Sequence, residues 1–262
     1  MLKQALVVAR KEIVDGLRDV RSVISSLFYA LMGPLVVGLV AIAVRGETKS
    51  NSSAAVLVGM MSIFAMVAAF VGGMNVAMDL VAGEREHRSL LPLLLNPVRR
   101  LDVVLGKWMA VSFFSVAALV LNLLGFAVVI ATSGMRITID WPPSLAAIAF
   151  GILPLSLFAA SAQLLISTVC RSIKEAQNYL SLIVFFPMGL GMFLVFFPAA
   201  RGAWSGFFPL VGQQLQLELL MKGGQIHLLQ PIVLGCFTAT VAILVLLVAA
   251  NRLQRDEIIY GN

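Results

Sequence analysis

Charged residues are scarce in this chain. Only 12% of its 262 residues are Asp, Glu, Lys or Arg, whereas 60% are hydrophobic. A soluble domain of this length needs far more charge on its surface, so the composition excludes a water-soluble fold and predicts a polytopic membrane protein. The net charge of +6 would suggest a nucleic-acid partner for a soluble protein. In a membrane protein we attribute it to basic residues at the cytoplasmic face of the bilayer, and we expect no nucleic acid.

Residues that carry catalysis or bind metals are also rare. Cys170 and Cys236 fall in different apolar runs and form no CxxC pair, which predicts neither a disulfide nor a metal site. His87 and His227 lie near opposite membrane faces, so neither suits an intramembrane protease. No GxxxxGK[ST] motif exists, so the chain cannot bind ATP through a P-loop. We therefore expect no catalytic residue, no metal and no cofactor on this chain, which is not an enzyme by itself.

Six apolar runs are each long enough to cross a hydrocarbon core, which takes about 20 helical residues. We place the six spans near residues 22–44, 54–78, 103–131, 144–169, 177–200 and 231–250. The predicted fold class is an all-α polytopic membrane protein, with one transmembrane domain covering residues 1–262. Of the 19 Lys and Arg residues, 14 fall on the side of the two termini and 5 on the other. This asymmetry predicts that both termini are cytoplasmic.

Residues 1–21 form an amphipathic segment before the first span. Its apolar residues recur at steps of three and four, which predicts a helix that lies in the bilayer interface with its apolar stripe at the acyl boundary. Its charged residues include Arg10, Lys11, Glu12 and Arg18. We expect the basic ones to lie among the lipid headgroups.

The segment from Gly83 to Lys107 is the longest charge-rich interruption between apolar runs, and it reads GEREHRSLLPLLLNPVRRLDVVLGK. Ser89 can cap a short helix that ends near Leu95, and Asn-Pro can begin a second helix. The pattern predicts a short apolar helix between two charged clusters at a membrane face, which is a docking surface rather than a catalytic one. The candidate contact residues within 83–102 are Glu84, Arg85, Glu86, Arg88, Leu90, Leu91, Leu93, Leu94, Arg99 and Arg100.

Residues 201–230 are too long for a simple outer turn. The apolar stretch from 211 to 221, followed by Gly223-Gly224, fits a half-helix that dips into the outer leaflet and returns. An ordinary outer-surface helix is the alternative. The candidate pathway or gate residues are Asn75, Asp79, Phe208, Pro209 and Gln213. Asp79 also fits a carboxylate at a helix end that reaches water, and we expect Asn122 and Gln163 to bridge neighbouring helices.

The loop pattern resembles the first cytoplasmic loop of type-2 ABC exporter permeases. The shared features are an acidic-basic-acidic triplet, a leucine run, Asn-Pro, a basic pair and Gly-Lys, and the resemblance is greatest to NatB-like sodium-extrusion and multidrug-type permease subunits. The Arg10-Lys11-Glu12 and Leu17-Arg18-Asp19 groups resemble the family's elbow helix, and residues 201–230 its outer gate region. The resemblance implies that residues 83–102 form a coupling helix that sits in a groove of a separate ATP-binding subunit.

The same resemblance implies how the protein works and with what. It implies the permease subunit of an ABC exporter in the cell inner membrane, with ATP and Mg²⁺ on the ATP-binding partner. It also implies a second permease copy, as a homodimer or a related heterodimer, within the lipid bilayer. The cargo stays open between sodium, a hydrophobic drug, a peptide and a lipid-linked molecule.

Two other functions compete with export. A six-span membrane anchor or sensor that transports nothing but docks a cytoplasmic partner would explain the loop equally well, although it has no need of a half-helix after Phe208. A transporter driven by an ion gradient would be expected to show mid-membrane carboxylates and an internal repeat, and the sequence has neither.

Overall fold

The computed structural model describes residues 2–44, 51–87, 99–133, 145–197, 202–224 and 227–253. These residues form helices and no strand, which confirms the all-α prediction. Six helical stretches are long and apolar enough to cross a membrane, also as predicted. They are Val20–Ala43, Ala55–Glu86, Arg100–Ser133, Leu145–Val169, Ile173–Phe196 and Leu229–Leu253.

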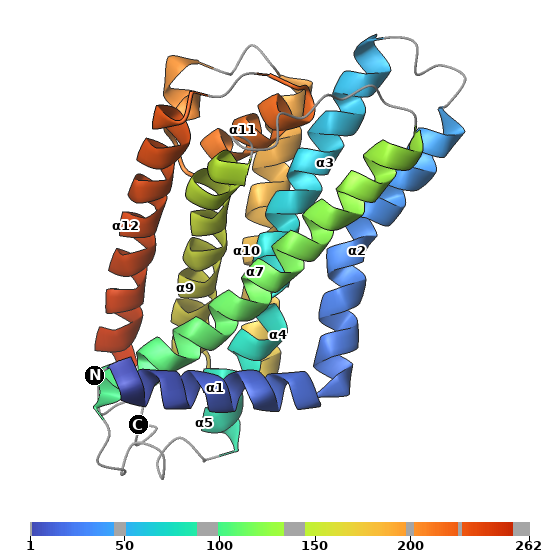
Figure 1. The fold of residues 1–262 in the computed structure, drawn as a ribbon. Coiled ribbons are helices and arrows are strands. Elements are labelled where there is room, and N and C mark those ends of the chain that lie inside the picture. The colour runs from blue at the N-terminus through green and yellow to red at the C-terminus, as the bar shows by residue number, and fades with distance from the viewer. Residues whose placement is uncertain are drawn as a thin grey trace.

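One helix lies across an end of the bundle, and the long helices run away from it (Figure 1). This helix is α1 (Leu2–Arg18), and we call its end of the molecule the α1 end. The long helices are α2 (Val20–Ala43), α3 (Asn51–Val71), α7 (Arg100–Ser133), α9 (Leu153–Val169), α10 (Ile173–Phe196) and α12 (Leu229–Leu253). The shorter elements are α4 (Met74–Ala77), η1 (Met78–Gly83), α5 (Glu84–Glu86), η2 (Ile148–Ile152), η4 (Ala203–Gly206) and α11 (Val211–Met221).

The corner between α1 and α2 is closed by Asp19. Its carboxylate accepts hydrogen bonds from the backbone N–H of Arg21, at 3.2 Å, and from the hydroxyl of Ser22. The Ser22 hydroxyl is the main cause that holds the pKa of Asp19 below its usual range. The charged carboxylate therefore caps α2 at neutral pH, and the cap weakens only as the pH falls through that lowered pKa.

The second span is interrupted near its middle. The α-helix α3 ends at Val71, Gly72 and Gly73 form a turn, and α4 leads into η1, which is a π-helix. A β-carbon on Gly72 would lie 2.3 Å from Cβ of Ala118, and one on Gly73 would lie 2.5 Å from Oγ of Ser115. Both contacts are to α7, so the two glycines let the interrupted span approach α7 closely.

Two buried amides connect helices inside the bundle. Asn122 of α7 donates a hydrogen bond to the backbone oxygen of Ala30 in α2 at 2.7 Å. Gln163 of α9 donates to the backbone oxygen of Phe70 in α3. Both side chains are fully buried, and both bridge neighbouring helices as predicted. The surrounding core is apolar, with large side chains such as Met61 from α3.

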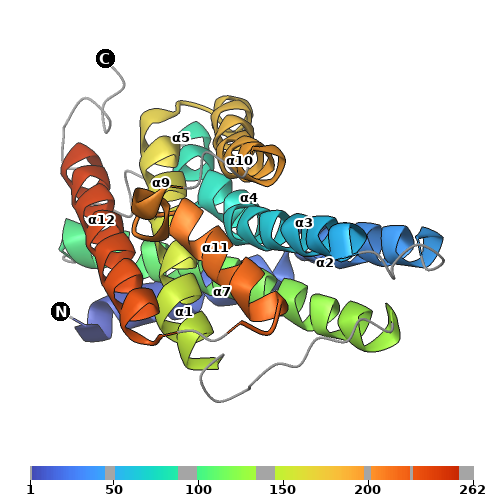
Figure 2. The ribbon, with the colours of Figure 1, turned by 90° about the horizontal axis from the view of Figure 1, so that it is seen from above.

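At the opposite end of the bundle, α11 lies across the ends of the long helices (Figure 2). Nine of its eleven residues are buried, including Gln213, Gln214, Gln216 and Glu218. An exposed surface helix does not fit this burial. The predicted half-helix held within protein does fit it, because its backbone and side chains are enclosed by the bundle.

Candidate coupling site at the α1 end

Lys107 of α7 is a buried cation, and its side chain is only 1% exposed. Its Nζ donates hydrogen bonds to the backbone oxygen of Leu80 at 2.6 Å and to Oε1 of Glu84 at 2.7 Å. Oε1 of Glu12 lies 3.7 Å from the same Nζ. We call Lys107, Glu84 and Glu12 the buried charge cluster. It joins α7 to η1, α5 and α1 through one ammonium group.

The surroundings of Lys107 explain why a charge is tolerated there. A buried ammonium group is costly unless carboxylates and hydrogen-bond acceptors surround it. Glu84 and Glu12 supply the carboxylates, and Leu80 supplies a carbonyl oxygen. On the solvent side, Lys11 reaches Oε1 of Glu12 at 3.3 Å, so Glu12 lies between a buried cation and an exposed one.

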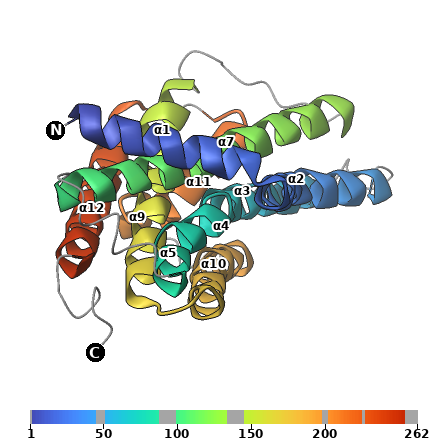
Figure 3. The same cartoon turned by 90° about the horizontal axis from the view of Figure 1, so that it is seen from below.

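Helix α1 packs closely on the start of α7 (Figure 3). Its buried face carries Ala5 and Ala9, which are 1% and 3% exposed. At Gly106 of α7, a β-carbon would lie 2.6 Å from Cβ of Val8 and 2.8 Å from the backbone oxygen of Ala5. Glycine therefore lets the backbone of α1 rest against α7. This close approach brings Glu12 within reach of Lys107.

The rest of the acidic-basic-acidic triplet contacts the connection between α9 and α10. Arg85 donates a hydrogen bond to the backbone oxygen of Cys170 at 3.3 Å. Glu86 accepts one from the backbone N–H of Ile173 at 2.8 Å. Burial is the main cause that raises the pKa of the Cys170 thiol, which is consequently a poor nucleophile. The triplet therefore links two regions: Glu84 belongs to the buried charge cluster, and Arg85 and Glu86 contact the connection between α9 and α10.

The predicted coupling helix itself lies mostly outside the described residues. This applies to Arg88, Leu90, Leu91, Leu93 and Leu94. On the far side of this segment the described chain resumes at Arg99, whose backbone oxygen accepts a hydrogen bond from the N–H of Asp102 at 2.9 Å. Arg100 then begins α7.

The four charged residues predicted for the elbow helix do not share one face. Glu12 points into the buried charge cluster and is 6% exposed. Arg10, Lys11 and Arg18 are exposed on the outward side of α1. The elbow segment therefore has an inner acidic contact and an outer basic surface.

The predicted pathway or gate residues lie in two separate groups. Asn75 of α4 donates a hydrogen bond to Oγ of Ser25 in α2 at 2.6 Å, so it joins two helices. Asp79 is exposed on η1, one turn closer to the α1 end. The structure therefore places both residues in the half of the bundle that contains the buried charge cluster.

The second group is at the α11 end. The side-chain oxygen of Gln213 accepts a hydrogen bond from the N–H of Leu210, and its amide donates to Oγ1 of Thr238 in α12 at 2.7 Å. Gln213 thereby fixes the start of α11 to α12. Phe208 is exposed, and Pro209 is half-buried just before this start. The two groups are not brought together in one site.

Sequence reasoning did not assign a role to Lys107. In the sequence, Lys107 is only the second residue of the Gly-Lys pair that closes the loop pattern. The role of Lys107 could have been suspected because the residue lies within a long apolar helix, where a cation requires a partner. Its partners come from three different segments of the chain.

Two comparisons with known proteins bear on these features. A family model described as ABC-2 family transporter protein matches residues 6–234. The ABC transporter permease protein NatB of Bacillus subtilis (strain 168) is 34% identical over 151 residues, which cover 55% of this chain and 39% of that relative. The matched region thus spans about two fifths of the relative's length. Because the family model covers most of the chain, including Glu12, Glu84 and Lys107, the protein belongs to the ABC-2 transporter family.

Proposed function

We propose that this chain is the membrane-spanning permease subunit of an ATP-driven exporter, and that residues 83–102 dock a separate ABC ATP-binding subunit. The observation that carries the proposal is the buried charge cluster. We call residues 83–102 the coupling segment. Glu84 lies near its start and Lys107 just beyond its end, and the two are joined to each other and to Glu12 of α1. A displacement of the segment would therefore act on α1, η1 and α7 together.

The partner supplies the ATP chemistry in this proposal. The chain has no P-loop, so ATP and Mg²⁺ would be bound by the ATP-binding subunit. Closure of that subunit around ATP would carry the coupling segment with it and bias the permease between inward-open and outward-open states. Arg85 and Glu86 would pass the same displacement to the connection between α9 and α10.

A second permease copy is part of the proposal, as a homodimer or a related heterodimer. Within one described bundle, the amides of Asn122 and Gln163 are used to connect helices. An apolar core fills the space between the helices. These features support a transport pathway at the interface of two copies rather than through the middle of one.

The proposed orientation places the α1 end in the cytoplasm of a cell inner membrane. Of the 19 basic residues, 14 fall in the terminal and loop segments that belong to this side. The positive-inside rule then assigns both termini to the cytoplasm and α11 to the outer face. Export is the direction implied by the resemblance of residues 83–102 to exporter permeases.

The burial of α11 favours transport over a membrane anchor without transport activity. An anchor that only recruits a partner needs the coupling segment but has no use for buried polar side chains at the far end. Gln213 and Gln214 are both fully buried there. Their hydrogen bonds connect α11 to two membrane-spanning helices, α12 and α10.

The docking proposal is tested by replacing Leu90, Leu91, Leu93 and Leu94 together with alanine. If these side chains fill a groove of the ATP-binding subunit, each well-buried Leu→Ala change costs about 2–5 kcal/mol. We expect the variant to lose co-purification with a co-expressed ABC ATP-binding subunit, and to lose stimulation of its ATPase activity.

A matched control replaces four leucines that face outward from the bundle. These are Leu39, Leu124, Leu244 and Leu247, which are between 50% and 68% exposed. This control should keep the partner at equal membrane expression. Retained binding and transport in the coupling variant would show that residues 83–102 do not dock the ATPase. ATP hydrolysis by the purified chain alone would also contradict the proposal.

A further inference from the structure

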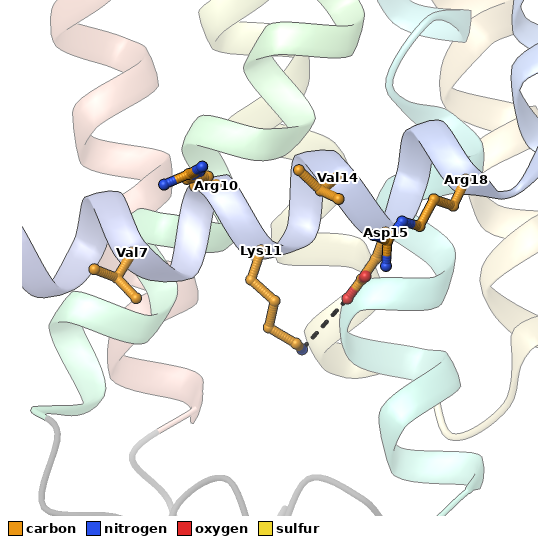
Figure 4. Close-up of a pocket in the computed structure, with 6 residues that line it drawn as sticks. All are labelled: Val7, Arg10, Lys11, Val14, Asp15 and Arg18. Carbon is orange, nitrogen blue, oxygen red and sulfur yellow. Dashed lines mark ion pairs between the residues drawn. The ribbon is translucent and has the colours of Figure 1, made fainter.

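The outward face of α1 contains a shallow groove on the side away from the buried charge cluster. It is lined by Val7, Arg10, Lys11, Val14, Asp15 and Arg18, all from α1 (Figure 4). These residues recur at steps of three and four, so they form one stripe along the helix. The stripe points away from α7, because the buried face of α1 is the one that carries Ala5 and Ala9.

The groove has an excess of positive charge. Its three cations face one carboxylate, Asp15, which gives a net charge of +2. Lys11 lies 3.3 Å from Glu12 and 3.9 Å from Asp15, so its charge is already compensated. In the described part of the chain, Arg10 and Arg18 form no ion pair. The uncompensated charge of the groove is therefore that of two guanidinium groups.

Apolar side chains are exposed beside these cations. Val7 and Val14 lie in the groove and are 69% and 37% exposed. Leu6 and Leu17 flank it and are 49% and 52% exposed. Helix α1 runs across the ends of the membrane-spanning helices, so this mixed surface lies at the level where the spans end (Figure 1). Such a surface fits a ligand with an anionic head and an apolar body.

We propose that this groove is a binding site for anionic phospholipids. Arg10 and Arg18 would pair with headgroup phosphates, because the guanidinium fork matches phosphate oxygens in geometry and charge. Val7 and Val14 would contact the glycerol and the first acyl carbons. The exposed valines and leucines favour a lipid over free phosphate, which has no apolar part.

Lipid binding here would influence the coupling site. Lys11 lies in the groove and contacts Glu12, and Glu12 contacts Lys107 in the buried charge cluster. An anionic headgroup that attracts Lys11 would weaken the contact between Lys11 and Glu12. Glu12 would then interact more strongly with Lys107. The lipid site is formed by exposed residues of α1 alone, so it does not depend on the proposed exporter function, although bound lipid would act on the same cluster.

The first test uses the purified full-length chain without any variant. The chain is equilibrated in detergent with equal amounts of phosphatidylglycerol and phosphatidylcholine, and the retained lipids are counted by native mass spectrometry. We expect phosphatidylglycerol to be retained in preference, and to raise the midpoint of thermal unfolding. Inorganic phosphate at the same concentration should have neither effect. Equal retention of the two lipids, or an equal effect of inorganic phosphate, would overturn the proposal.

The second test replaces Arg10 and Arg18 with glutamine, singly and together. Each change is expected to lower retention of phosphatidylglycerol about fivefold, which corresponds to about 1 kcal/mol per basic residue near an anionic surface. The matched control is Arg252→Gln, which removes the same charge from an exposed position at the end of α12. It should retain the lipid like the unaltered chain.

The remaining outcomes also decide the question. Unchanged retention in the double variant would exclude the groove, and an equal loss in the Arg252→Gln control would show a non-specific effect of net charge. Arg10→Lys and Arg18→Lys should bind more lipid than the glutamine variants and less than the unaltered chain, because lysine keeps the positive charge but lacks the guanidinium fork. Docking of an ABC ATP-binding subunit is measured on the same variants. Loss of that subunit with lipid retention intact would assign the face to the partner instead.

Discussion

The Nζ of Lys107 lies 2.7 Å from Oε1 of Glu84, although the two residues are 23 positions apart in sequence. The residues between them include the four leucines predicted to dock the ATP-binding subunit, Leu90, Leu91, Leu93 and Leu94. The ion pair therefore holds the chain just before and just after these leucines close together. The same ammonium group contacts Glu12, so both ends of this stretch are also held against α1.

Lys107→Met is expected to destabilise the protein strongly. The change removes the buried cation that lies between Glu84 and Glu12 in the described part of the chain, and both carboxylates are largely buried. Loss of one partner from a buried ion pair costs about 3–5 kcal/mol, because it leaves an uncompensated charge. Thermal unfolding of the purified chain in detergent measures the effect.

The control for Lys107 is Lys174→Met, which removes an exposed lysine of α10 at the same end of the bundle. It should shift the unfolding midpoint little. Combining Lys107→Met with Glu84→Gln should recover part of the loss, since it removes the negative charge of one carboxylate that Lys107 contacts. An unfolding midpoint for Lys107→Met equal to that of Lys174→Met would refute the role given to the cluster.

Gly106→Ala is expected to separate α1 from α7. The new β-carbon would meet Cβ of Val8 and the backbone oxygen of Ala5, and overpacking of this kind costs about 1–3 kcal/mol. Limited proteolysis should then cleave within residues 2–18 faster than in the unaltered chain. Gly189→Ala is the control, because a β-carbon there has no neighbour within 4 Å. Equal cleavage rates in the two variants would argue against the tight α1 contact.

Gln216→Leu is expected to stabilise the chain. Both polar atoms of this buried amide lack a hydrogen-bond partner in the described structure, and an unpaired buried amide costs about 1–3 kcal/mol. Gln163→Leu is the contrasting variant and should destabilise, since the Gln163 amide donates to Phe70 of α3. Unfolding midpoints that move in the same direction for both variants would contradict this assignment.

The orientation is tested with single cysteines in a chain whose Cys170 and Cys236 are replaced by alanine. A cysteine at Gly202 should react with a membrane-impermeant thiol reagent in intact cells, and one at Arg171 should react only after the cells are opened. Both positions are exposed in the structure, so a lack of reaction reports the membrane side rather than burial. The reverse pattern would overturn the orientation inferred from the basic residues.

The sequence predicts the spans well because hydropathy and helix length together define them. The second span shows the limit of this rule. It was predicted to end at Met78, yet the helix continues through η1 to Glu86. Hydropathy falls at Asp79, but the helical backbone continues into the charged triplet, where Arg85 and Glu86 contact the connection between α9 and α10.

The candidate site was predictable only in part. The charged pattern around Glu84 and Glu86 indicated a docking segment, because charge between apolar runs is informative without any structure. The pairing of Lys107 with Glu12 was not predictable, because it depends on the packing of α1 against Gly106. The partners of Asn75 and Gln213 are likewise set by tertiary contacts rather than by spacing along the chain.

The interruption at Gly72 and Gly73 divides the second span into two rods with a joint between them. The lower rod, α4 to α5, carries Glu84 and is fixed to Lys107, whereas the upper rod, α3, packs against α10 and α11. A continuous α-helix would force both rods to tilt as one body. With the joint between them, a displacement of the lower rod at the α1 end need not tilt α3, which keeps its packing against α10 and α11.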